Sequence, residues 1–493
     1  MNLTRVRCAA LRGVLLVALS GFAAAAAGQA NSFATPPQPG APRPLAIAAP
    51  VEQRLPNGLR VVLAERPGVQ LVTAQLLVLS GSETDPTDRA GLAALTAALL
   101  PQGTTSHSAS ALASAAESLG GTLEASAGWH QSTLAITVAV PFLDAALGLV
   151  SEAVRRPRFA AAEFDRQRRQ ALDELKVAYA NPATLAALAS QHLLFGSGAY
   201  GHPSSGTPAS LARIRRAEIV AMHAANYRPD NAVLILSGDI DTIGALRLAR
   251  RHFGDWTAAT PSPGAAPLRE AGKALPQQVA IIDMAQSGQS AVVLAAPVPP
   301  LAGPERAVAA VLNAVLGGAY SSRLNQEIRI RRGLSYSAGS RLEPRPLGGL
   351  LQVVVQTKNE SATEVLALVQ HELDRLVDEP IDAAELSARK ATLIGDFGRS
   401  VETTAGLGAA VRSLIVAGLP PDELRTRIDA LVDVNADEVR TFAATVLGEA
   451  GRRAVVAGDA SRFQDALKAA RPSVTVIPVG SLDLESGVGI GAP

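Results

Sequence analysis

Cysteine is almost absent from the sequence, and the single cysteine, Cys8, lies close to the start of the chain. If export removes this N-terminal segment, the mature protein has no cysteine. It therefore has no disulfide and no thiol nucleophile. Aromatic residues make up only 3% of the chain, and no basic run contains interleaved aromatics. The net charge of +1 gives no bulk attraction to nucleic acid or to an anionic membrane. These absences argue against a disulfide-stabilised, thiol-dependent or nucleic-acid-binding protein.

The N-terminal segment has the pattern of a secretory signal peptide. Arg5, Arg7 and Arg12 precede an apolar run at residues 13–27, and small residues follow. The run is too short for a usual membrane span, although a retained anchor helix is the alternative. No later segment reaches about 18 uninterrupted apolar residues. We therefore expect cleavage before Asn31, no stable membrane span afterwards, and a bacterial periplasmic location.

The second half of the chain repeats features of the first. An amphipathic helix followed by a charged helix is predicted at residues 142–175 and again at 363–397. An apolar strand ends in Gly-Asp at 238–239 and again at 458–459. Two copies of one α+β unit explain these repeats and fit a chain of 493 residues. The predicted divisions are a signal peptide (1–30), a Pro/Ala-rich linker (31–50), an N-terminal domain (51–257), a linker (258–274), a C-terminal domain (275–475) and a tail (476–493).

Residues Gly91–Thr104 read GLAALTAALLPQGT and are predicted to form a short helix. Turn-forming residues precede the segment, and Pro101-Gln-Gly103 closes it. Three alanines share one face of this helix because they stand at i, i+3 and i+4. They are Ala94, Ala97 and Ala98.

The segment resembles the helix of the pitrilysin/insulinase metallopeptidases (the inverzincins), which reads G-L-A-H-x-x-E-H-x-x-x-x-G-T. The flanking Gly-Leu-Ala and Gly-Thr match that frame. The resemblance places Ala94 and Ala98 at the two zinc histidines and Ala97 at the catalytic glutamate. An alanine methyl group can neither bind a metal nor transfer a proton.

Other motifs extend the resemblance over nearly all of residues 51–469. They include Tyr-Gly-His-Pro at 200–203, Gly-Ala-Tyr-Ser-Ser-Arg-Leu at 318–324, and Arg-Gly-Leu-Ser-Tyr at 332–336. The family implies two homologous α/β-sandwich lobes of the pitrilysin/mitochondrial-processing-peptidase type. Such lobes face each other like a clamshell around a chamber that holds peptide.

Glu174 stands where the family has its third zinc ligand, in a charged helix downstream of the paired-histidine position. One carboxylate cannot form a zinc site, which needs three protein ligands. A solvated helix glutamate is the alternative, and we interpret Glu174 as a relic. None of the seven histidines has metal-ligand spacing to another. The sequence predicts that this chain binds no metal.

Arg329 and Tyr336, seven positions apart, are the candidate catalytic residues. In family members that cut peptides, such a pair reaches the active site from the second half. An arginine can donate two hydrogen bonds to a carbonyl, and a tyrosine hydroxyl can stabilise developing negative charge. The alternatives are that Arg329 belongs to a solvated basic helix end with Arg331 and Arg332, and that Tyr336 packs in a strand.

Residues 123–127 form a predicted strand, and the family pairs extended substrate with this edge. Leu123, Glu124 and Ala125 are therefore candidate substrate-binding residues. An internal strand with no free edge is the alternative, since edge position cannot be read from one sequence.

These features predict a metal-free partner subunit of a periplasmic zinc endopeptidase of the insulinase type. The chain would have no peptidase activity alone, would bind extended peptides, and would supply Arg329 and Tyr336 to a homologous subunit that carries H-x-x-E-H and the zinc. The main alternative is a non-enzymatic structural or peptide-binding member of the family. A self-sufficient metallopeptidase is disfavoured by the three alanines, and no basis for a nucleic-acid partner is present.

Overall fold

The computed structural model describes residues 47–258 and 270–485, so the predicted signal peptide and most of both predicted linkers lie outside the described residues. The first half contains six strands and eight α-helices among its described residues. They are β1 (Val51–Arg54), β2 (Arg60–Glu65), β3 (Leu71–Val78), α2 (Leu92–Leu99), α3 (Ala109–Ser118), β4 (Glu124–Ala127), β5 (Ser132–Ala139), α4 (Leu143–Arg155), α5 (Ala161–Tyr179), α6 (Pro182–Phe195), α7 (Pro208–Arg213), α8 (Arg216–Asn226), β6 (Ala232–Gly238) and α9 (Thr242–Phe253).

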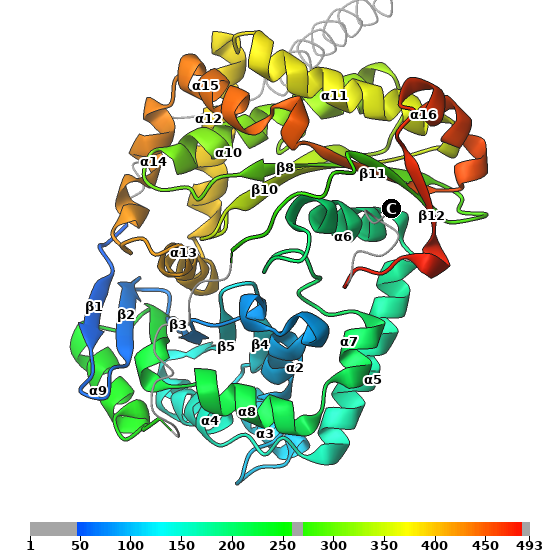
Figure 1. The fold of residues 1–493 in the computed structure, drawn as a ribbon. Helices are drawn as coiled ribbons and strands as arrows, with labels where there is room; N and C mark the ends of the chain where they lie inside the picture. The colour runs from blue at the N-terminus through cyan, green and yellow to red at the C-terminus, as the bar shows by residue number, and fades with distance from the viewer. Residues whose placement is uncertain (1–46, 259–269, 486–493) are drawn as a thin grey trace, which may run out of the picture. The chain divides into compact units, whose positions relative to one another are not determined.

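The second half is built from a similar series of elements (Figure 1). They are β7 (Val279–Asp283), β8 (Ser290–Val298), α10 (Glu305–Leu316), the π-helical turn η5 (Asn325–Arg331), β9 (Ala338–Glu343), β10 (Gly349–Thr357), α11 (Ala362–Asp378), α12 (Ala383–Ser400), α13 (Thr404–Val416), α14 (Glu423–Asp433), α15 (Ala436–Val446), β11 (Arg453–Gly458), α16 (Gln464–Ala470) and β12 (Thr475–Pro478).

Each half forms one six-stranded sheet, and five strands of each sheet follow the same order. The first sheet runs β1-β2-β6-β3-β5-β4 and the second runs β12-β7-β11-β8-β10-β9. In both sheets a parallel pair, β2 with β6 or β7 with β11, adjoins a run of antiparallel pairs. The outermost strands beside these pairs differ, because β1 pairs antiparallel with β2 and β12 pairs parallel with β7. The predicted α+β fold of two homologous lobes is therefore confirmed.

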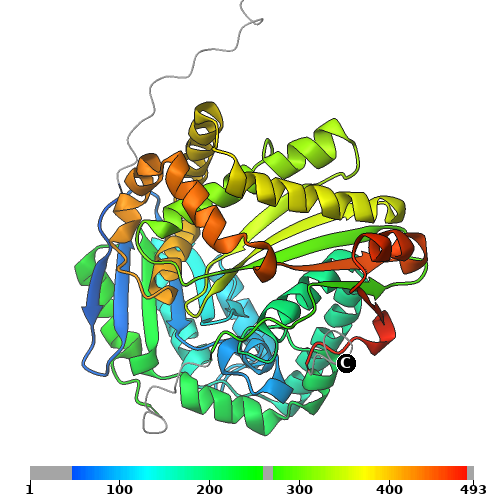
Figure 2. The ribbon, with the colours of Figure 1, turned by 45° about the horizontal axis from the view of Figure 1, so that its top comes forward.

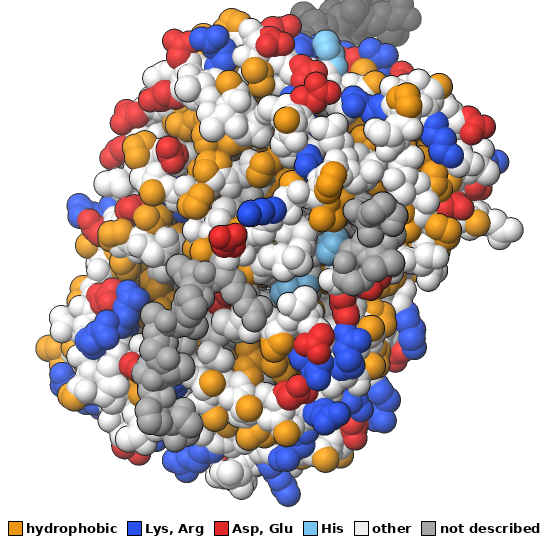
Figure 3. All heavy atoms as spheres, viewed as in Figure 1, with side chains coloured by type: hydrophobic (Ala, Val, Ile, Leu, Met, Phe, Trp, Pro, Cys, Tyr) orange, Lys and Arg blue, Asp and Glu red, His pale blue; other side chains and the backbone are white. Residues whose placement is uncertain are grey.

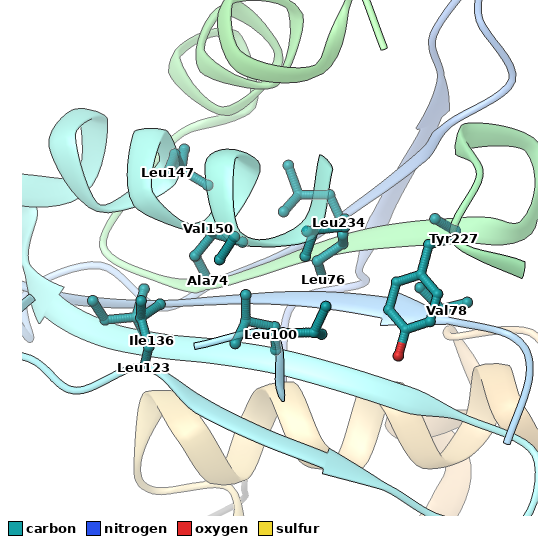
Figure 4. Close-up of a cluster of buried hydrophobic side chains, with 14 of the residues drawn as sticks. Ala74, Leu76, Val78, Leu100, Leu123, Ile136, Leu147, Val150, Tyr227 and Leu234 are labelled. Atoms are coloured by element: carbon teal, nitrogen blue, oxygen red, sulfur yellow. The ribbon is translucent and has the colours of Figure 1, made fainter. Parts of the chain in front are cut away.

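Both faces of each sheet are buried. Successive side chains along a strand point to opposite faces, and the side chains on each face enter a hydrophobic cluster. In β2, Val61 and Leu63 enter the core shared with the helices of the first half. Their neighbours Val62 and Ala64 enter a second cluster on the other face. In Figure 4, Leu147 and Val150 of α4 lie over strand residues of the first of these cores.

The second face of each sheet is covered by a helix from the other half. Helix α13 packs on β3 and β6 of the first sheet, and α6 packs on β8 and β11 of the second. Figures 1 and 2 show α6 alongside the second sheet from two directions. The hydroxyls of Thr73 in β3 and Thr404 in α13 are 2.8 Å apart in this contact. The two halves therefore complete each other's hydrophobic cores.

Arg345 makes a further contact between the halves. It follows β9, is 6% exposed, and places its guanidinium carbon 4.6 Å from the ring centroid of Trp129 and 4.9 Å from that of Tyr200. Its Nη2 donates to Gln191 in α6 at 3.0 Å. Because Trp129 lies two residues after the end of β4, this contact helps to hold the end of that strand.

Helices α7 and α8 are separated at Ile214, which is extended and fully buried, and a capping box at Arg215 and Glu218 starts α8. The expected boundary of the C-terminal domain at residue 475 is too early, because β12 pairs with β7 and Leu484 is buried. No helix among the described residues is long and apolar enough to cross a membrane.

Candidate functional site

Helix α2 carries the three alanines and is fixed at its start by Asp85. The Asp85 carboxylate oxygens accept the N–H groups of Gly91 and Ala93, each at 2.9 Å. Burial raises the pKa of Asp85 to about 8, although these two donors oppose the shift. Gly91 has φ of 89°, a left-handed conformation that favours glycine. The start of α2 is thus tightly defined by the local sequence.

The alanine face of α2 gives a metal no donor atom. Ala97 is fully buried, and Ala94 and Ala98 are half-buried. Helix α2 packs against α5, the helix that carries Glu174. Glu174 itself is exposed and accepts a hydrogen bond from Gln170 at 3.0 Å. These residues do not fit a zinc ion, and no group of three His, Cys, Asp or Glu residues that could hold a metal occurs in 47–258 or 270–485.

Strand β4 lies at the edge of the first sheet, where it pairs with β5 on one side. Of the three candidate substrate-binding residues, Glu124 is exposed and Ala125 is half-buried. Leu123 precedes the strand, and its side chain is 9% exposed within the core. The side chain of Leu123 is therefore used in packing, and only its backbone is open to a role in binding.

In the second half, Arg329 and Tyr336 lie in contact. The guanidinium carbon of Arg329 is 5.2 Å from the ring centroid of Tyr336 and 5.1 Å from that of Tyr320. Both rings are exposed, Tyr336 at 88% and Tyr320 at 69%. Such cation–π contacts position a guanidinium without neutralising its charge.

The local sequence explains how these side chains meet. Arg329 lies in η5, a π-helical turn, and such turns occur frequently at functional sites. Gly333, at φ of 64°, ends the turn in a left-handed conformation and reverses the chain. The loop that follows is held against β10, because Ser335 donates to the carbonyl of Gln356 and Thr357 donates to that of Leu334, each at 2.6 Å.

The loop that carries Tyr320 is fixed to α12. Arg389 donates to the hydroxyl of Ser321 at 2.7 Å, and Arg323 forms a bidentate contact with Glu385. Tyr320 was not among the site residues expected from the sequence, although it lies in the Gly-Ala-Tyr-Ser-Ser-Arg-Leu motif at 318–324. That motif signals the loop, but nothing in the sequence places the Tyr320 ring beside Arg329.

Arg329 differs from its basic neighbours Arg331 and Arg332 in its ion pairing. Arg331 pairs with Glu327 at 3.0 Å, and Arg332 pairs with Glu327 at 2.8 Å and with Glu364 at 3.4 Å. The Arg332 hydrogen bond lowers the pKa of Glu327 from its usual value. Arg329 has no ion pair with any described residue. Of the three arginines, it is therefore the one whose charge is available to a ligand.

The structure thus gathers the candidate residues into two groups. Helix α2, which carries the three alanines, contacts β4 in the first half, and Arg329, Tyr336 and Tyr320 form a contact group in the second. Arg329 and its two ring partners all belong to the second half.

Comparison with known proteins matches both halves of the chain. The family model for insulinase (peptidase family M16) matches residues 60–197, and the model for the peptidase M16 inactive domain matches residues 213–393. An uncharacterized zinc protease of Mycobacterium tuberculosis is 30% identical over 364 residues, which are 73% of this chain and 82% of that protein. An uncharacterized zinc protease of Streptomyces coelicolor is 27% identical over 84% of this chain and 91% of its own.

Solved structures agree with this result. The crystal structure of a peptidase M16 inactive domain from Pseudomonas fluorescens has a TM-score of 0.77 at 25% identity and covers 83% of this chain and 98% of that one. A protease from Helicobacter pylori has a TM-score of 0.78 at 18% identity and covers 84% of this chain and 100% of its own, which shows the shared fold. The chain belongs to the insulinase family, peptidase family M16.

Proposed function

We propose that this chain is the metal-free partner subunit of a periplasmic zinc endopeptidase. It binds extended peptide and supplies Arg329 and Tyr336 to the active site of a homologous subunit that carries H-x-x-E-H. The observation that supports this proposal best is the arrangement of Arg329, whose guanidinium contacts two exposed tyrosine rings and has no ion pair among the described residues.

The chemistry of the pair suits peptide bound at another subunit's metal. A guanidinium offers a fork of N–H donors to a peptide carbonyl. A phenolic hydroxyl donates to a carbonyl oxygen as that oxygen gains charge in the transition state. Tyr336 is 88% exposed, so its hydroxyl is free to meet a molecule that approaches from outside the second half.

Strand β4 supplies a place for extended peptide. An edge strand presents unpaired N–H and C=O groups, and a peptide that adds as a further strand satisfies them. The proposed contacts are made by the backbone of Leu123, Glu124 and Ala125, with the exposed Glu124 side chain beside the peptide. The adjacent α2 has only alanines on its former metal-binding face, so the zinc is proposed to belong to the partner.

The periplasmic part of the proposal rests on the N-terminal sequence. The basic start, the short apolar run and the small residues near position 30 are the features of an exported protein. Mass spectrometry of the chain recovered from periplasm tests it, with a mature N-terminus near Asn31 as the expected result.

The decisive experiment tests whether this chain assembles with a zinc-binding homologue into an active peptidase. The chain is co-expressed with an H-x-x-E-H homologue from the same organism, and the two are analysed by size exclusion and by cleavage of an unstructured peptide. We expect a complex that cleaves and this chain alone to be inactive. Failure of every such homologue to assemble with the chain favours the non-enzymatic, peptide-holding alternative.

A further inference from the structure

A large cavity lies in the second half, away from Arg329 and Tyr336. Its volume is about 960 Å³, within the range of small-molecule sites. Four helices, α10, α12, α13 and α14, contribute most of its lining. The lining is largely apolar and includes Leu393, Phe397, Leu414 and Leu424. In Figure 3, hydrophobic side chains gather at the upper left, where Figure 1 places α10, α12 and α14.

Two arginines are part of this largely apolar lining. Arg306 of α10 is half-buried, and Arg427 of α14 is exposed, with its guanidinium carbon 5.4 Å from the ring centroid of Phe397. Partial burial lowers the pKa of Arg306, and Glu423 partly offsets the shift. Partial burial of the guanidinium and the nearby Arg306 charge both lower the pKa of Arg427. The two like charges repel each other, and an anion bound between them relieves that repulsion.

The carboxylates of the lining do not neutralise the pair. Within residues 47–258 and 270–485, neither Arg306 nor Arg427 has an ion-pair partner within 4.0 Å. The remaining acidic lining residues, Asp429, Asp433 and Glu438, are exposed at the rim. No carboxylate contributes to the pKa shift of Arg427. The pair therefore remains available for a bidentate contact with a ligand carboxylate or similar anion.

We propose that this cavity binds a long-chain alkyl carboxylate, with the carboxylate between Arg306 and Arg427 and the chain along Leu393, Phe397 and Leu424. An alkyl chain suits the lining better than a peptide does. Four helices form most of the wall, and Leu342 of the edge strand β9 is the one lining residue that lies in a β-strand. Along the helix faces, the N–H and C=O groups of a peptide backbone would be left largely unpaired at a large cost. A hydrocarbon chain has no such groups, and it gains from removal of apolar surface from water.

The test uses the purified mature chain and a fluorescent fatty acid, 11-(dansylamino)undecanoic acid, displaced by palmitate below its micelle concentration. We expect saturable binding at one site. The variants R306Q and R427Q keep polar side chains of similar length but lose the charge, and each should weaken binding by at least about tenfold. The matched control is R425Q. Arg425 lies on α14 with Arg427, pairs with Asp422 at 3.4 Å and does not line the cavity.

Two further measurements distinguish binding at this cavity from non-specific adsorption to the protein surface. Hexadecanol has the same chain without the carboxylate and should displace the probe poorly. A photoreactive palmitate analogue should label peptides from α13 and α14. Equal affinity in R306Q, R427Q and R425Q, or equal displacement by hexadecanol, would overturn the proposal. Circular dichroism melts of each variant confirm that lost binding is not lost folding.

Discussion

The guanidinium carbon of Arg329 lies 5.2 Å from the ring centroid of Tyr336, and the ring is almost wholly exposed. A tyrosine that packed in a strand would bury its ring, and an arginine of a solvated helix end would gain little from aromatic contacts. The arrangement places a charged fork and a phenolic hydroxyl side by side on an accessible surface.

Loss of either member of the pair should damage cleavage by the assembled complex without preventing assembly. Removal of one donor aimed at developing oxyanion charge costs about 3 kcal/mol, or roughly a hundredfold in rate. Tyr336→Phe keeps the ring that contacts Arg329, so it should lower kcat with less effect on KM. Arg329→Ala removes a group that is proposed to contact the bound peptide as well, so its KM should also rise.

The matched control for this pair is Arg331→Ala. Arg331 is equally basic and two residues away, but its charge is paired with Glu327. Steady-state cleavage by each co-purified complex is the measurement. Wild-type kcat/KM in all three variants would show that Arg329 and Tyr336 serve only packing and surface charge.

Tyr320 is predicted to position Arg329 through its ring and not through its hydroxyl. Tyr320→Leu should lower kcat/KM of the complex a few-fold, since an exposed cation–π contact contributes about 0.5–1 kcal/mol. Tyr320→Phe retains the ring and should remain close to wild type. A larger loss in Tyr320→Phe than in Tyr320→Leu would assign the role to the hydroxyl.

The isolated chain is predicted to contain no stoichiometric zinc and to cleave no unstructured peptide. The reason is that Ala94, Ala97 and Ala98 offer no ligand and no base. Elemental analysis of the purified chain, with a peptide assay in the presence and absence of chelator, is sufficient. One zinc per chain together with chelator-sensitive cleavage would contradict the prediction.

Ala97→Glu, which restores the family's carboxylate, should destabilise this chain. Ala97 is fully buried, so a carboxylate there would lose its hydration at a cost of roughly 2 kcal/mol or more. Ala94→Glu is the control, because position 94 is half-buried on the same helix. Chemical unfolding of both variants should show the larger loss for Ala97→Glu, and equal losses would show that α2 shifts to accommodate the charge.

Acid should destabilise the fold through two histidines, the buried His192 and the half-buried His223. Burial lowers the pKa of His192 and of His223 from the usual 6.5. The unfolded chain therefore binds protons that the folded chain does not, and stability present at neutral pH is lost as the pH falls below about 6.5. Each histidine contributes a slope of up to about 1.4 kcal/mol per pH unit.

His223→Gln is the variant that isolates one of these contributions. It should lower stability at neutral pH, since the contact of Nε2 with the Val154 carbonyl at 2.7 Å is altered. It should also flatten the dependence of the unfolding free energy on pH between pH 6.5 and 5. An unchanged slope, measured by urea unfolding over this range, would show that His223 does not titrate differently in the two states.

Much of this protein can be read from its sequence because the relevant signals are local. The alanines at 94, 97 and 98 exclude a metal-binding face on α2 whatever surrounds it, since the side chains have no donor atoms. The repeat of helix and strand patterns predicts two similar lobes, and the structure confirms them. The spacing of Arg329 and Tyr336 is local too, because one π-helical turn and the glycine after it bring the two together.

Which helix covers which face of each sheet depends on packing between elements that are far apart in the sequence. The alternation of Val61 and Val62 shows that a strand buries both faces, but hydrophobicity is non-directional and does not name the covering helix. In this protein each half supplies the covering helix for the other half's sheet: α6 packs on the second sheet and α13 packs on the first. The edge position of β4 and the cavity lined by Arg306 and Arg427 likewise depend on residues brought together from distant parts of the chain. Tyr320 and Arg329 are near in sequence, but their contact depends on how the loop of Tyr320 is held against α12.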